Sequence, residues 1–84
     1  MGQNYPNPFS RQTFIEIYTP ASMKIELIIN DINGKIVHSK AVSVQKGKNV
    51  LPIQPNHLIS SGLYFYSIVG KDFHLTKRMI YNAP

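Results

Sequence analysis

The sequence predicts an all-β domain, and three observations lead to that prediction. Six or seven short segments are rich in β-branched and aromatic residues or alternate between apolar and polar side chains. Turn-forming residues recur about every ten residues between these segments. No stretch shows the apolar spacing of an amphipathic helix. The pattern favours an immunoglobulin-like antiparallel β-sandwich of six to seven strands, and a small Greek-key barrel is the alternative.

Length and composition restrict residues 1–84 to a single domain without disulfides. The chain is too short for a second core, and it contains no cysteine for disulfide or thiolate chemistry. No run reaches the roughly 18 apolar residues of a membrane span, and no export signal opens the chain. We interpret Met1-Gly2 as an expression start on a piece of a longer protein. The net charge of +5 comes from nine basic residues that form no block.

The most apolar segment is 60–69, and we expect it to be the central strand. After a turn of small residues, residues 63–69 carry no charge. The segment is too short for a core helix, and its aromatic and β-branched residues fit a strand with both faces at least partly covered. Such a strand needs a neighbour on each side and a second layer above it.

An arm and two strands open the chain. Two X-Pro steps in residues 4–9 exclude a helix start and favour an extended arm at a sheet edge. We expect the rings of Tyr5 and Phe9 to fold onto the sandwich, and we prefer a packed arm to a ligand-binding loop. Residues 13–18 and 23–30 alternate as half-buried strands, whose inward positions are Thr13, Ile15, Ile17, Met23, Ile25, Leu27 and Ile29.

The strongest turn signal is Asn33-Gly34, because both residues tolerate positive φ and lie between two apolar runs. It predicts a hairpin that leads into a return strand at 35–44. The alternation of that strand changes phase at Ala41-Val42, which predicts a bulge or a change of sheet there.

Three further segments complete the expected sandwich. Residues 49–53 form a strand at a sheet edge or near its own end, because Pro52 cannot donate a backbone hydrogen bond. We expect Leu58 and Ile59 to plug the open end of the core. The last strand, 73–81, has two mixed faces, which suits a place near a sheet edge, and residues 82–84 form a frayed tail.

The residue types that catalysis or metal binding needs are scarce and scattered. The four carboxylates lie in turns or at outward strand positions, and no pair is placed for acid–base work. No nucleophile elbow and no glycine-rich phosphate loop is present. We therefore expect no enzyme activity and no cofactor. Without cysteine or a nearby carboxylate, we also expect no metal site at the three separate histidines His38, His57 and His74.

Basic and aromatic residues together could form a nucleic-acid platform, since phosphates attract cations and bases stack on exposed rings. Here the aromatic residues Tyr64, Phe65 and Tyr66 lie in the most apolar segment, where a core position is the better interpretation. We expect solvated basic faces and no nucleic-acid partner.

Several motifs, taken in order, resemble one known family. They are Asn4-Tyr5-Pro6-Asn7-Pro8-Phe9, the strand and turn from Ile25 through Asn33-Gly34 to Val37, Ser61-Gly62-Leu63-Tyr64-Phe65-Tyr66, and Thr76-Lys77-Arg78-Met79-Ile80. In order and spacing, the whole chain resembles a type A C-terminal sorting domain of the Bacteroidetes type IX secretion system, also called the Por secretion system.

The resemblance implies an immunoglobulin-like sandwich at the end of a large exported protein, with no chemistry of its own. In that family the upstream cargo crosses the inner membrane by its own signal, and the outer-membrane translocon recognises the folded domain. A shuttle protein carries it to a sortase-like protease, which cuts upstream of the domain and often joins the cargo to anionic lipopolysaccharide. The implied route leads through the periplasm to the cell surface or the medium.

The resemblance also assigns residues to two groups. The structural motif positions of the family fall on Tyr5, Pro6, Asn7, Pro8, Phe9 and Gly34. The positions nearest the part that the machinery reads fall on Gly62, Tyr64, Phe65, Tyr66, Lys77, Arg78, Met79 and Ile80.

Two departures from the family pattern stand out. Many members carry a tryptophan in the strand where this chain has residues 50–53. We interpret the absence of tryptophan there as a core substitution. Many also end on a lysine soon after the last strand, where this chain has residues 81–84, and this leaves the true terminus open.

The residues themselves, without the resemblance, also fit a domain that another protein recognises as a sorting signal. A small module with a mixed final strand can be read through its last hairpin, by an added strand or by side chains that enter a partner pocket. The alternative is a passive or carbohydrate-binding sandwich appended to an extracellular enzyme, with Phe14 and Tyr18 exposed on an outer face.

Overall fold

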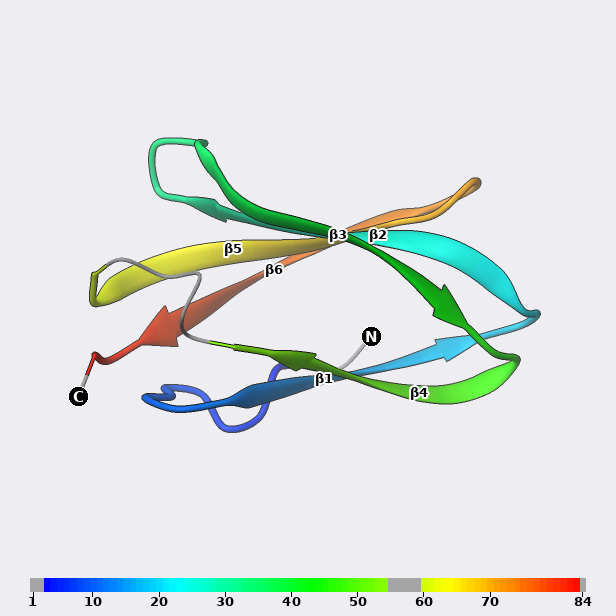
Figure 1. Ribbon diagram of the computed structural model, residues 1–84, viewed down its shortest axis with the longest axis horizontal. Helices are drawn as coiled ribbons and strands as arrows, with labels where there is room; N and C mark the ends of the chain where they lie inside the picture. The colour runs from blue at the N-terminus through cyan, green and yellow to red at the C-terminus, as the bar shows by residue number, and fades with distance from the viewer. Residues whose placement is uncertain (1–2, 55–59, 84) are drawn as a thin grey trace.

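The computed structural model describes residues 3–54 and 60–83, which form six β-strands and no helix. A four-stranded sheet has the order β3-β2-β5-β6, and β1 and β4 form a two-stranded sheet. All strand pairs are antiparallel, and Figure 1 shows the two sheets as separate layers. The all-β prediction is confirmed, and the architecture is consistent with an immunoglobulin-like sandwich. The strands are β1 (Thr13–Thr19), β2 (Met23–Asp31), β3 (Ile36–Val44), β4 (Gly47–Ile53), β5 (Gly62–Val69) and β6 (His74–Tyr81).

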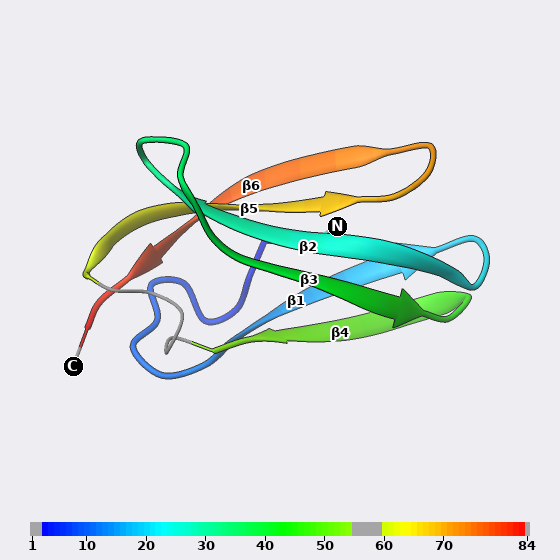
Figure 2. The ribbon, with the colours of Figure 1, turned by 45° about the horizontal axis from the view of Figure 1, so that its top comes forward.

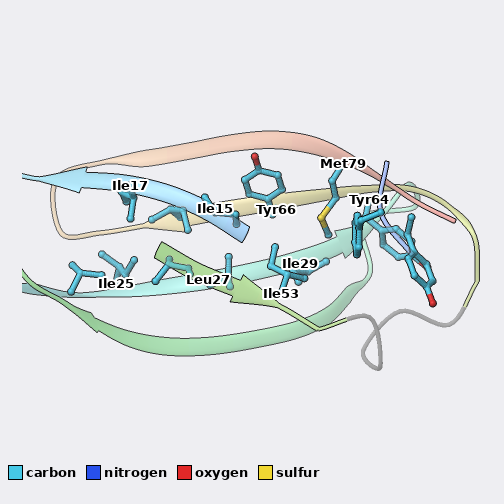
Figure 3. Close-up of a cluster of buried hydrophobic side chains, with 14 residues drawn as sticks. Ile15, Ile17, Ile25, Leu27, Ile29, Ile53, Tyr64, Tyr66 and Met79 are labelled. Atoms are coloured by element: carbon cyan, nitrogen blue, oxygen red, sulfur yellow. The ribbon is translucent and has the colours of Figure 1, made fainter. Parts of the chain in front are cut away.

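The core lies between the two layers and is built from one face of each sheet. Alternation along β1 buries Thr13, Ile15 and Ile17, as the sequence predicts, and leaves the intervening side chains exposed. Figure 3 shows apolar side chains from both sheets meeting in this space. The contributions of the four-stranded sheet include Ile25, Leu27, Ile29, Tyr64, Tyr66, Ile68 and Met79.

Strand β5 is central, as its composition predicts. It pairs with β2 on one side and β6 on the other. Its inward side chains Tyr64, Tyr66 and Ile68 are buried, and on its outer face Ser67 is buried while Phe65 is half-buried. The partial cover of the outer face explains why this segment contains no charge.

The hairpin between β2 and β3 forms at the predicted turn, although only one residue there has a positive φ. Gly34 has φ +83°, whereas Asn33 does not adopt a positive φ. The Gly34 N–H donates to the Asp31 carbonyl (3.0 Å), and the Asp31 N–H donates to the Lys35 carbonyl (2.9 Å). A tight turn followed by a left-handed glycine therefore closes the hairpin. The Asp31 carboxylate stabilises the loop by accepting the N–H groups of Asn33 (2.9 Å) and Lys35 (3.0 Å).

The predicted irregularity at Ala41-Val42 is wrong, because the bulge lies near the start of β3. Asn30 pairs with Ile36 and Ile29 pairs with His38, so Val37 is the extra residue. From there to Val44 the register is regular. The misleading feature is Lys40, an exposed side chain at an inward position of an edge strand. A lysine can reach water from such a position, because its ammonium group sits on a long flexible stem.

Two of the three places where the chain changes sheet, between β1 and β2 and between β3 and β4, are tied together. Thr19, at the end of β1, donates its hydroxyl to the Gln45 carbonyl in the turn after β3 (2.7 Å). Strand β4 then pairs only with β1, and Pro52 lies next to the end of β4, as predicted for an edge strand. The expected plug of Leu58 and Ile59 lies outside the described residues.

The N-terminal arm closes one side of the sandwich, where it contacts both layers (Figure 2). Tyr5 exchanges two backbone hydrogen bonds with Phe14 of β1 (2.8 and 2.9 Å). Phe9 pairs in parallel with Tyr81 of β6, and the two rings lie 5.3 Å apart. The arm thus takes the edge position that the prolines predict.

The rings of the arm point in opposite directions, so the expectation of two packed rings is half wrong. Phe9 is 2% exposed, but Tyr5 is 79% exposed. Directly paired residues of antiparallel strands share a face, and Phe14 points outward, so Tyr5 must point outward too.

Hydrogen bonds beneath the arm satisfy its buried polar groups. The Asn4 N–H donates to the Tyr66 hydroxyl (2.9 Å), and the Asn4 amide donates to the Thr13 hydroxyl (3.0 Å). Thr13 in turn donates to the Pro6 carbonyl (2.7 Å). Asn4 is 2% exposed, so the contact with Tyr66 joins the arm to the centre of the four-stranded sheet.

The chain after β6 is also held, and the prediction of a frayed tail is wrong for two residues. The Asn82 N–H donates to the Phe9 carbonyl (2.8 Å), and the Ala83 N–H donates to the Ser61 hydroxyl (2.7 Å). Pro84 lies outside the described residues. Residues 3–54 and 60–83 contain no helix long and apolar enough to span a membrane.

Candidate recognition hairpin

The eight positions assigned to recognition all lie on the hairpin of β5 and β6. Its register places Phe65 opposite Arg78, Tyr66 opposite Lys77 and Tyr64 opposite Met79. Gly62 and Ile80 belong to neighbouring pairs of the same ladder. Antiparallel pairing therefore brings together motifs that are separate in the sequence.

Three of the eight side chains point into the core and hold the hairpin in place. Tyr64 is 5% exposed, while Tyr66 and Met79 are fully buried (Figure 3). The Tyr64 hydroxyl donates to the Ser60 carbonyl (2.7 Å). Burial raises the pKa of Tyr66, although the hydrogen bond from Asn4 opposes this effect, so the buried phenol stays neutral at physiological pH.

The other five positions reach the surface. Gly62, Arg78 and Ile80 are exposed, and Phe65 and Lys77 are half-buried. A shallow hollow of about 340 Å³ lies beside them, lined by Gln3, Phe65, Thr76, Lys77 and Arg78. An aromatic face and two cations therefore border the same open space.

The surface of the hairpin is basic. Lys71, Lys77 and Arg78 lie on β6 and in the turn before it, and Asp72 is the single carboxylate there. Within the described part of the chain, none of these three cations forms an ion pair. They are available to an anionic partner.

The outer edge of β6 is covered along only part of its length. At the C-terminal end, the Phe9 N–H donates to the Ile80 carbonyl (3.1 Å), and the Ile80 N–H donates to the Asn7 carboxamide oxygen (2.9 Å). Gln3 donates its side-chain N–H to the Arg78 carbonyl (2.7 Å). The arm thus occupies the edge up to Arg78 and stops there.

The structural motif positions support this arrangement from two sides. Asn7 and Phe9 bind the end of β6, while Pro6 accepts the Thr13 hydroxyl. Pro8 lies between them on the exposed surface of the arm. Gly34 belongs to the β2–β3 turn, which borders a second hollow of about 330 Å³ together with Ser61, Gly62 and Tyr64.

A family model described as "secretion system C-terminal sorting domain" matches residues 3–82, nearly the whole chain. The chain belongs to this family. No curated protein and no solved structure matches it. The match covers the arm, both sheets and the β5–β6 hairpin, so it confirms the resemblance that the motifs carry.

Membership gives this sorting domain its general role. It is a type IX sorting signal, which marks a protein for export to the cell surface or the extracellular space. It acts through the type IX machinery and is attached to an upstream cargo. Sorting signals are not a catalytic family. Among the described residues, no three His, Cys, Asp or Glu side chains form a group that could hold a metal ion.

The histidines of the sorting domain lie apart. His38 belongs to β3 and His74 to β6, at opposite edges of the four-stranded sheet. His57 lies outside the described residues.

Sequence reasoning missed Gln3, His74 and Thr76 at the hairpin. Gln3 contacts Arg78 across 75 positions of sequence, and no local pattern announces such a contact. The alternation of β6 does show that His74 and Thr76 share a face with Arg78. That pattern becomes informative only once β6 is known to be an edge strand.

Proposed function

We propose that this sorting domain directs an upstream cargo through the outer-membrane type IX translocon by presenting the β5–β6 hairpin. The observation that carries the proposal is the match over residues 3–82, because it includes a hairpin with exposed and unpaired cations. A partner can recognise such a hairpin by adding a strand to its exposed edge, with pockets for alternate side chains.

The structure supports a division of labour among the eight assigned residues. The exposed and half-buried members, Gly62, Phe65, Lys77, Arg78 and Ile80, are placed to contact the machinery. The buried members, Tyr64, Tyr66 and Met79, fix the shape of the hairpin and contact no partner while the sandwich is folded.

After recognition, a shuttle protein transfers the domain to a sortase-like protease, which cuts between the cargo and the arm. The packing of the arm supports a cut upstream of it. Asn4 and Phe9 are both buried, so a protease can reach the chain there only if the arm leaves the sandwich. The domain itself contributes presentation and no chemistry.

The test is a charge reversal on the hairpin with a matched control at the opposite edge. A periplasmic reporter is fused in front of residues 3–84, and secretion is measured in a host that has the system. Arg78→Glu should reduce secretion, whereas Lys40→Glu on β3 should not, because both residues are exposed but only Arg78 lies on the hairpin. Equal secretion of the two variants at equal melting temperature would remove Arg78 from the site.

A second candidate function rests on an exposed aromatic row on the two-stranded sheet. Tyr5 and Tyr18 are 79% and 66% exposed, and Phe14 is 40% exposed. The Lys48–Glu16 ion pair (3.1 Å) lies on the same face. Rings flanked by polar groups can stack on sugars and bind their hydroxyls, which supports a carbohydrate-binding role.

Pull-down on insoluble polysaccharides tests the second candidate. Tyr18→Ala should lose at least half of any bound fraction, and Ile32→Ala, an exposed apolar residue remote from the row, should lose none. Absence of saturable binding by the unchanged domain excludes this function.

A further inference from the structure

We propose that the uncovered part of the β6 edge, residues 74–78, pairs with an extended acidic segment of a partner protein, which adds a fifth strand to the four-stranded sheet. The inference deepens the proposed function, on which it rests for the identity of the partner as a component of the export machinery. It commits to strand addition rather than insertion of side chains into a pocket.

The register of the hairpin shows which backbone groups are available. The Gly70 N–H donates to the Phe73 carbonyl (2.9 Å), so this is a hydrogen-bonded pair within the hairpin. Bonding alternates along an antiparallel ladder. The even-numbered residues of β6 therefore direct their N–H and C=O groups away from β5, and the contacts of the arm with Arg78 and Ile80 agree with this direction.

The free groups form a short continuous row. No described residue bonds the outward N–H and C=O of His74 and Thr76, or the N–H of Arg78. Unpaired edge groups of this kind are a template for another strand. Five backbone groups are thus available in a row along residues 74–78.

The arm shows that this edge accepts an extended segment. Phe9 pairs in parallel with Tyr81 of β6 through backbone hydrogen bonds. An added strand at residues 74–78 would continue the line that the arm occupies, with Gln3 at the junction of the two. The hollow of about 340 Å³ lies at the same junction and leaves room for the side chains of the incoming segment.

Charge and alternation specify the side chains of the partner. Directly opposed residues share a face, so a residue opposite Arg78 lies on the outer face and a residue opposite Lys77 on the inner face. Opposed charges of unlike sign stabilise such pairs, so both partner residues should be acidic. Leu75, which is 40% exposed on the inner face, favours an apolar partner. In an antiparallel partner, read from its N-terminal end, the residues opposite Arg78 and Lys77 should therefore be acidic. The residue opposite Thr76 can be of any type, and the residue opposite Leu75 should be apolar.

The same charges oppose a second copy of this chain as the occupant, and the other edge of the sheet is less suited to strand addition. A second copy of β6 would bring Lys77 and Arg78 close to their own counterparts, and lysine on an edge strand is a common device against such pairing. The other edge of the sheet, β3, carries a bulge at Val37 that interrupts a regular ladder. The β6 edge is therefore the better receptor for a heterologous strand.

The test in solution is a titration of the whole 84-residue chain with two synthetic peptides. One contains Glu-Glu-Thr-Val-Thr, the order that places its acids opposite Arg78 and Lys77, and the other has Lys in place of Glu. Amide shifts should concentrate at residues 74–78, and the Lys peptide should bind roughly tenfold more weakly. Equal affinity of the two peptides, shifts centred on β3, or no shifts at all would overturn the proposal.

Two variants at one position separate the backbone from the side chain. Thr76→Pro removes an outward N–H without removing a bond to β5, and proline is tolerated on such an edge. Thr76→Val removes only the hydroxyl, which contacts the Ser67 hydroxyl (2.9 Å). If the partner binds by strand addition, Thr76→Pro should no longer bind the acidic peptide, and Thr76→Val should bind it as tightly as the unchanged chain does. Equal binding by both folded variants would contradict it.

Charge exchange and secretion complete the test. The double variant Lys77→Glu/Arg78→Glu should reverse the preference and favour the Lys peptide, a gain that misfolding cannot produce. In the host with the type IX system, the reporter carrying Thr76→Pro should stay in the periplasm. If it is secreted like the unchanged fusion, the edge proposal fails while the address function stands. If the unchanged fusion itself stays in the periplasm, the address function fails.

Discussion

Replacing Tyr66 with phenylalanine tests how the arm is attached to the sandwich. The Tyr66 side chain is fully buried, and its hydroxyl accepts the N–H of Asn4 at 2.9 Å. The substitution keeps the ring and its packing and removes a single oxygen. It therefore removes the hydrogen bond between the arm and the centre of the four-stranded sheet without changing the ring.

The magnitude follows from the burial of Asn4. Asn4 is 2% exposed, so its N–H cannot exchange the lost partner for water while the arm stays docked. Leaving a buried donor unsatisfied costs about 1–3 kcal/mol. For a domain of this size, a change of 1 kcal/mol lowers Tm by roughly 4–8 °C.

Urea denaturation and amide hydrogen exchange measure the effect. Tyr66→Phe should be less stable by about 1–3 kcal/mol, and the amides of Tyr5 and Phe14, which pair the arm with β1, should exchange faster. Tyr64→Phe is the control, because its hydroxyl bonds the Ser60 carbonyl and does not touch the arm. Unchanged stability of Tyr66→Phe, or equal exchange at the arm in both variants, would refute the reasoning.

Three further predictions concern the turn, the arm and alkaline pH. Gly34→Ala should lower the free energy of unfolding measured in urea by about 1–2 kcal/mol, because alanine is strained at φ +83°. An added Cβ would meet no heavy atom within 4 Å, so backbone strain is the only cost. Unchanged stability would contradict the turn geometry. Phe9→Ala should lower the free energy of unfolding by about 3 kcal/mol, since the ring is 2% exposed and packs on Tyr81. The arm amides should also lose protection from hydrogen exchange. A loss of stability below about 1 kcal/mol would contradict a docked arm. Burial raises the pKa of Tyr66 in the folded state, so its contribution to stability is full below the ordinary tyrosine pKa of about 10 and is lost as the pH rises through the raised value. Tyr66→Phe should therefore lose less stability at alkaline pH than the unchanged protein. If the free energy of unfolding depends on pH in the same way in both proteins, this assignment is wrong.

Local patterns determine much of the fold. Strict alternation along residues 13–19 identifies which side chains of β1 are buried, and the uncharged run at residues 63–69 identifies the central strand. Asn33-Gly34 locates the hairpin, because few residues other than glycine tolerate φ +83°. These features depend only on residues that are close together in the chain, so they can be predicted from the sequence.

Contacts between distant segments could not be predicted in the same way. Phe9 pairs with Tyr81 and Gln3 reaches Arg78, and nothing in either segment specifies the other. The outward direction of Tyr5 follows from its pairing with Phe14, which is equally non-local.

The site was predictable as a hairpin but not as a surface. The motif resemblance indicates β5 and β6 correctly, yet only the packing shows that Met79 is buried whereas Arg78 is exposed. The partial cover of the β6 edge depends on the path of the arm, which alternation cannot reveal.

The central claim is that this chain sends an attached protein out through the type IX system. The most direct measurement is the fraction of a periplasmic reporter at the cell surface and in the medium when this chain is fused behind it, in paired strains with and without the translocon. The account predicts export in the first strain and periplasmic retention in the second. Retention in both strains, or equal export from both, would contradict it.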